Sequence, residues 1–176
     1  NSFVEKINRK ILYHPLGKCG ILYIGQIGCY ITHYSILKMI VEKEYDNTIV
    51  LENDIKFKDR EWRSYVKNVM DKELPEDYDM LLLYSRGRNI NQPEYRILGK
   101  ELITRYNKTS GAVAFLISLN GAKKMIKLLE SNLIKPFDLF IKELASDPEN
   151  KIFNLTKNFI NVTDVDSTIK VNSKSV

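Results

Sequence analysis

The sequence predicts an α/β fold in which a largely parallel central sheet is flanked by helices. Three apolar runs, at 48–51, 79–84 and 112–117, are typical of strands buried on both faces. Between them, apolar residues recur at three- and four-residue steps, which is typical of amphipathic helices. Strands that alternate with helices usually run parallel, because each helix carries the chain back across the sheet. With 176 residues and no Pro/Gly/Ser-rich linker, the chain is expected to form a single domain, 1–176.

The first predicted helix leads into the first predicted strand. The turn-like segment 44–47 ends this helix, whose apolar positions are Ile27, Tyr30, Ile31, Tyr34, Leu37, Ile40 and Val41. The strand at 48–51 is followed directly by three polar residues, Glu52, Asn53 and Asp54, which we expect where the chain leaves the core. A second helix over 59–70 would bury Trp62, Val66 and Val69.

The later half of the chain repeats this alternation. The polar, arginine-containing segment 85–93 is expected to be a surface loop between the second and third strands. A helix begins at 120–121, and Pro136 suits the first turn of another. Beyond Lys151, a weaker alternation predicts short strands near a sheet edge.

Composition and charge exclude several classes of protein. The net charge is +5, but basic residues are interspersed with acidic ones and no RNA-binding signature is present, so nucleic acid is not an expected partner. No apolar run approaches the roughly 20 residues that a transmembrane helix needs. Cys19 and Cys29 match neither a zinc spacing nor a disulfide framework, and we expect both to be reduced and partly buried. Since no secretory signal is visible either, a cytoplasmic protein is expected.

Glu52 and Asp54 are the residues that most directly suggest a metal site. In open α/β sheets, ligands bind outside the carboxyl ends of the strands, where these two residues are expected. In an extended strand, side chains two residues apart face the same side. Two carboxylates there would offer the hard oxygen ligands that Mg²⁺ and Mn²⁺ prefer. Taken alone, however, Glu-Asn-Asp is ordinary turn composition, and these three residues favour a polar turn over a metal site.

Four segments in their order and spacing change that balance. They are GQIGCYITH at 25–33, IVLENDIKF at 49–57, TSGAVAFLIS at 109–118 with GAKK at 121–124, and PFD at 136–138. Together they resemble glycosyltransferase family 25, which includes lipopolysaccharide-assembling transferases and collagen hydroxylysine galactosyltransferases. The resemblance implies a GT-A type fold, a UDP-sugar donor and Mn²⁺ (or Mg²⁺) as the ion. It also implies transfer of galactose or glucose to a glycan or a hydroxylysine-type acceptor.

The resemblance also suggests roles for the residues around the first strand end. Asp54 is the expected metal ligand, and Glu52 is expected to be a metal ligand or a ribose contact. Asn53 lies between them at the donor site, where the family usually has the middle acid of Glu-Asp-Asp. The amide keeps hydrogen-bonding capacity but removes one negative charge. This departure favours an alternative in which the chain is a catalytically degenerate member that binds a ligand or a partner protein.

Three further residues are expected at the site by resemblance. Asp138 is the candidate general base that would take the proton of the acceptor hydroxyl; alternatively, it is an acid that stabilises the first turn of a helix through the helix dipole. His33 and Gly111 are expected to help bind the donor. Their structural alternatives are a packed helical histidine and a glycine that allows close packing.

Two features lie near the ends of the chain. The family begins with a strand carrying an Asn-Leu-x-Arg-Arg-like segment, which this sequence lacks. Two expectations follow as alternatives: the domain is N-terminally incomplete, or the protein binds its donor differently. Asp164 and Asp166 form a second acid-x-acid pair and are a weaker alternative for the metal.

Overall fold

A computed structural model describes residues 24–84, 95–106, 112–131 and 135–162. Its helices are α2 (Ile24–Glu42), α3 (Trp62–Lys72), α4 (Leu119–Ser131) and α5 (Phe137–Leu144). Its strands are β1 (Asn47–Leu51), β2 (Ile55–Phe57), β3 (Met80–Leu82), β4 (Ile103–Arg105), β5 (Ala114–Ser118), β6 (Ile152–Leu155) and β7 (Ile160–Val162). The helices and strands predicted from apolar periodicity are all present, with bounds that differ by a few residues.

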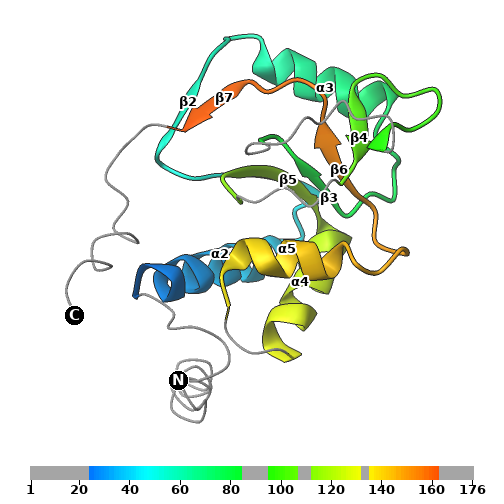
Figure 1. Ribbon diagram of the computed structural model, residues 1–176. Coiled ribbons are helices and arrows are strands. Elements are labelled where there is room, and N and C mark those ends of the chain that lie inside the picture. Colours follow the sequence, from blue (N-terminus) through cyan, green and yellow to red (C-terminus); the bar gives the residue numbers. More distant parts are fainter. Residues whose placement is uncertain (1–23, 85–94, 107–111, 132–134, 163–176) are drawn as a thin grey trace.

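The elements form three layers, with a five-stranded sheet as the middle one (Figure 1). Helices α2, α4 and α5 cover one face, and their apolar side chains form one core cluster with residues of the sheet. Helix α3 and the small β2–β7 sheet cover the other face and form a second cluster, which includes Trp62 and Phe159. None of the helices in the described ranges has the length and apolar character that a bilayer crossing requires.

The expectation of a largely parallel sheet is wrong. The strand order is β1-β5-β3-β6-β4, and the β3–β6 pair is the parallel one; the β1–β5, β5–β3 and β6–β4 pairs are antiparallel. The pairings show that β1 and β3 do run in the same direction, as a helical crossover between them predicts. They are not neighbours, however, because β5 lies between them and runs the opposite way. The fold is therefore a mixed α/β fold.

Two strands also differ from expectation in their position. β1 is an edge strand, and Ile49 and Leu51 are 38% and 40% exposed, whereas we expected a buried parallel strand. In contrast, β6 was expected near an edge but lies between β3 and β4, with all four of its residues buried. The loop expected at 85–93 falls on residues outside the described ranges.

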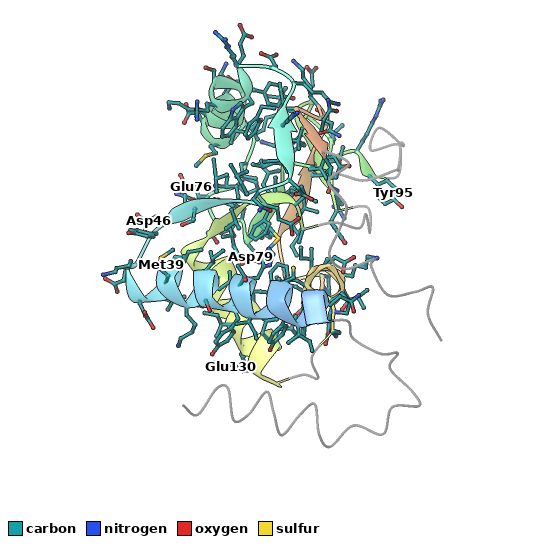
Figure 2. All side chains as sticks on the ribbon, turned by 90° about the vertical axis from the view of Figure 1, so that its left-hand side faces the viewer. Met39, Asp46, Glu76, Asp79, Tyr95 and Glu130 are labelled. Carbon is teal, nitrogen blue, oxygen red and sulfur yellow. The ribbon has the colours of Figure 1, made fainter. Side chains whose placement is uncertain are left out.

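Asp79 joins α4 to the sheet. Its side chain is fully buried, and its carboxylate accepts hydrogen bonds from Lys124 Nζ (2.7 Å), Asn120 Nδ2 (3.1 Å) and the backbone N–H of Lys151 (2.9 Å). Figure 2 shows Asp79 in the interior, whereas Met39 and Asp46 lie at the margin. A Cβ on Gly121 would lie only 2.1 Å from the Asp79 carbonyl oxygen. The Gly-Ala-Lys-Lys segment therefore has a packing function in this fold.

Candidate functional site

Helix α2 presents Cys29 and His33 one turn apart on the same face. His33 is 4% exposed, and its ring stacks on Phe137 of α5 with a centroid distance of 4.1 Å. Phe115 of β5 stacks against the same ring at 5.9 Å. Cys29 is half-buried and is not in a disulfide. The pairing of α2 with α5 and the sheet thus fixes where both side chains lie.

The hydrogen bonds of His33 indicate its tautomer. Nδ1 lies 2.9 Å from the Cys29 carbonyl oxygen, which can only accept, so Nδ1 carries a proton. Burial lowers the pKa of His33, while the nearby backbone of Cys29 and of Ala112 acts in the opposite direction. A neutral ring protonated at Nδ1 has its lone pair on Nε2. Nε2 is buried, and within the described ranges no donor or acceptor meets it in good hydrogen-bond geometry.

Glu52 and Asp54 lie in the turn between β1 and β2. The Glu52 N–H donates to the carbonyl of Val113 (2.9 Å), which fixes Glu52 next to the start of β5. The chain then turns at Asn53 and Asp54, so the extended backbone expected for this segment is not observed. Both acids are half-buried. The pKa of Glu52 is raised mainly by burial and, to a smaller extent, by the negative charge of Asp54. The two carboxylates are therefore close enough to repel each other.

Cys29, His33 and Glu52 form a cluster of possible metal ligands. One ligand atom from each of the three side chains lies within 4.8 Å of those of the other two. Asp138 lies within electrostatic range of the Cys29 thiol. Burial, followed by the negative charges of Glu52 and of Asp138, raises the pKa of Cys29 to about 11. The structure therefore brings together an imidazole, a thiol and carboxylates from α2, the β1 end and α5.

The remaining residues predicted for the site have different environments. Asp138 is half-buried in the first turn of α5, directly after Phe137. Asn53 is exposed at the turn. Gly111 lies outside the described residues, as does the alternative acid pair Asp164 and Asp166.

Cys29 is the member of the cluster that sequence reasoning missed. It was expected to be only a partly buried thiol, and its half-buried, unbridged state agrees with that expectation. The signal that could have found it is the four-residue spacing from His33, which places both side chains on one face of a helix. Its approach to Glu52, however, depends on how α2 packs against the sheet.

A separate cavity of about 440 Å³ lies at the other end of the strands. Its lining includes Lys100, Arg105, Asp147 and Lys151, from β4, β6 and the segments next to them. The pairings make β1 and β6 run in the same direction. The residues after β1 and those before β6 therefore lie at opposite ends of the strands. The cavity is therefore not part of the Cys29 cluster.

Two comparisons with known proteins point to the same family. The pattern of "Glycosyltransferase family 25 (LPS biosynthesis protein)" matches residues 6–141, a range that includes Cys29, His33, Glu52, Asp54 and Asp138. Human procollagen galactosyltransferase 2 is 24% identical over 119 residues, which cover 66% of this chain and 19% of that protein. Zebrafish (Danio rerio) procollagen galactosyltransferase 1 is 25% identical over 151 residues, covering 80% of this chain and 24% of that protein.

Relatives named as inactive are equally similar. The rat protein "Probable inactive glycosyltransferase 25 family member 3" is 26% identical over 118 residues, covering 66% of this chain and 20% of that protein. The chain spans between about a fifth and a quarter of the length of these curated relatives.

Proposed function

We propose, starting from the fact that the chain belongs to glycosyltransferase family 25, that it is a metal-assisted hexosyltransferase. Its donor is a UDP-sugar of galactose or glucose, and its acceptor is a hydroxyl group of a glycan or of a hydroxylysine-type side chain. The observation that carries the proposal is the gathering of Glu52, Asp54 and Asp138 around one end of the sheet, within the range that matches the family.

The carboxylates of Glu52 and Asp54 suit Mn²⁺ or Mg²⁺. Both offer hard oxygen ligands. Their mutual repulsion, which adds to burial in raising the pKa of Glu52, would be relieved by a divalent cation between them. Asn53, exposed at the same turn, can donate or accept a hydrogen bond to the donor. When bound, the cation neutralises charge on the diphosphate as the sugar leaves it.

Asp138 is the residue proposed to act on the acceptor. In an inverting transfer, its carboxylate takes the proton of the acceptor hydroxyl while that oxygen forms a bond to the anomeric carbon. The bond between this carbon and the diphosphate oxygen breaks, and UDP leaves with the electron pair. Phe137, stacked on His33, holds the start of α5 against α2 and so fixes where Asp138 lies.

A donor-binding and turnover experiment tests these roles. The full chain is incubated with UDP-galactose or UDP-glucose, acceptor and Mn²⁺, and UDP release is measured along with UDP binding by calorimetry. Asp54→Ala should abolish Mn²⁺-dependent UDP binding, whereas Asp138→Asn should retain it and lose transfer. Asp71→Ala, which removes an exposed acid of α3, is the matched control and should change neither. Full activity of Asp54→Ala would show that the metal site has been misassigned.

The second candidate function is a binding module without catalysis. It is favoured by Asn53, which replaces one acid of the family's motif, and by relatives whose names call them inactive. In that case the full chain would bind UDP or a partner protein but release no UDP with either donor. Asn53→Asp is the informative variant: if the missing charge is the defect, this substitution should raise Mn²⁺ affinity.

A further inference from the structure

Cys29, His33 and Glu52 offer a ligand set whose chemistry differs from that of the paired carboxylates. A thiolate and an imidazole bind Zn²⁺ and Co²⁺ more strongly than they bind Mg²⁺ or Mn²⁺. A carboxylate is a common third ligand in such sites. One ligand atom from each of the three lies within 4.8 Å of the others. In a tetrahedral zinc site, ligand atoms are about 3.6 Å apart, so a small inward movement of the side chains would suffice.

The backbone already holds these three residues in place. Cys29 and His33 are fixed by one helical turn of α2, and His33 is stacked between Phe137 and Phe115. The backbone of Glu52 is held by the hydrogen bond that its N–H donates to the carbonyl oxygen of Val113. Few residues would therefore have to be ordered when an ion binds, which lowers the entropic cost of binding.

The histidine is also suited to serve as a ligand. Its Nδ1 lies 3.4 Å from Cys29 Sγ and is thus the nitrogen that faces the thiol. If Nδ1 binds an ion, the ring must change tautomer. Nδ1 gives its proton to solvent, Nε2 takes one up, and the ring stays neutral. The backbone of Ala112 raises the pKa of His33, as a nearby hydrogen-bond acceptor does. It is therefore available to accept a hydrogen bond from Nε2–H. Metal-bound histidines commonly donate their second N–H to a backbone carbonyl in this way.

The electrostatics around the thiol favour a cation. Glu52 and Asp138 both place negative charge near Sγ, in partly buried surroundings. A divalent ion bound by the Glu52 carboxylate and the Cys29 thiolate would be neutralised by the two, with the thiol proton released to solvent.

We propose that Cys29, His33 and Glu52 form a site for a thiophilic divalent cation of the Zn²⁺ type, with water in the fourth position. This binding does not depend on the proposed transferase function. One consequence does rest on it: because Glu52 belongs to both ligand sets, Zn²⁺ at this site and Mn²⁺ at Glu52 and Asp54 compete for its carboxylate. Zn²⁺ would then inhibit a transferase that Mn²⁺ activates.

Titration of the metal-stripped full chain with Co²⁺, a spectroscopic substitute for Zn²⁺, tests the site. We expect one equivalent to produce a thiolate-to-Co²⁺ charge-transfer band, which added Zn²⁺ removes. Cys29→Ser should abolish the band, while Cys19→Ser, the matched control, should keep it. His33→Gln should weaken Co²⁺ binding by more than the roughly 10–100-fold typical for loss of a residue that only supports a ligand.

Two further variants separate this site from the carboxylate pair. Asp54→Asn should keep the Co²⁺–thiolate band, and Glu52→Gln should lose affinity for Co²⁺ and for Mn²⁺. Circular dichroism checks that each variant is folded, and Cys29→Ser, the smallest change, serves if His33→Gln does not fold. A Co²⁺ spectrum without a thiolate band, or a band that survives in Cys29→Ser, would overturn the proposal. Neither reading involves a sugar donor, so failure here is distinct from failure of the transferase assay.

Discussion

Gly121 and Gly28 are helical glycines whose replacement by alanine should change stability in opposite directions. A Cβ on Gly121 would lie 2.1 Å from the carbonyl oxygen and 2.7 Å from the carbonyl carbon of Asp79, well inside the 3.4 Å at which ordinary contact begins. Asp79 cannot easily retreat, because its carbonyl accepts the Ser118 N–H (3.1 Å) and its own N–H donates to Lys151 (2.9 Å). A Cβ on exposed Gly28 would meet nothing within 4 Å.

The magnitudes follow from these contacts. Overpacking against backbone costs about 1–3 kcal/mol or more, and alanine regains up to about 1 kcal/mol of helix propensity. Because a 2.1 Å approach to a backbone oxygen is at the severe end of this range, Gly121→Ala should lower the free energy of unfolding by about 2 kcal/mol. Gly28→Ala should raise it by about 0.5–1 kcal/mol, because the gain in helix propensity has no opposing clash there.

Urea unfolding followed by circular dichroism measures both variants. With a slope of about 1–3 kcal/mol per molar urea, Gly121→Ala should move the midpoint down by about 1 M, and Gly28→Ala should move it up by a smaller amount. The slope itself should not change if both variants unfold in the same way as the parent. If Gly121→Ala left the midpoint unchanged or moved it up, the close approach of α4 to Asp79 would not be a determinant of this fold.

Two other predictions follow from buried or half-buried ionisable groups. Lys124→Met removes one hydrogen bond to the buried Asp79 carboxylate and should cost about 1.5–3 kcal/mol in urea unfolding, whereas Lys123→Met, on the exposed side of α4, should cost little. In a metal-free Cys19→Ser background, iodoacetamide should modify Cys29 about 100-fold more slowly at pH 8 than an ordinary cysteine, since a pKa raised to about 11 leaves little thiolate. The rate should rise as the pH approaches 11, and a rate typical of an unperturbed thiol would contradict the charge environment described for Cys29.

The candidate site was partly predictable from the sequence. Glu52, Asp54, Asp138 and His33 were identified by their order and spacing, and the structure places them near one another at one end of the sheet. The contribution of Cys29 was not predicted, because a single cysteine on a helix carries no signal about which residue from another element it will face. The packing function of Gly121 and Lys124 was likewise missed, since their partner, Asp79, is some forty positions earlier in the chain.

The sequence by itself determined the local elements of this protein and its family. Apolar periodicity follows from the geometry of a single helix or strand, and so it located α2, β3, β5 and α4 without knowledge of their neighbours. Strand order was decided only in the tertiary structure: β5 lies between β1 and β3 and makes the sheet mostly antiparallel. A buried strand has the same apolar composition whichever way its neighbours run, because direction is set by hydrogen bonds between segments far apart in the chain. The meeting of Cys29 with Glu52 has the same origin, because it depends on packing between elements.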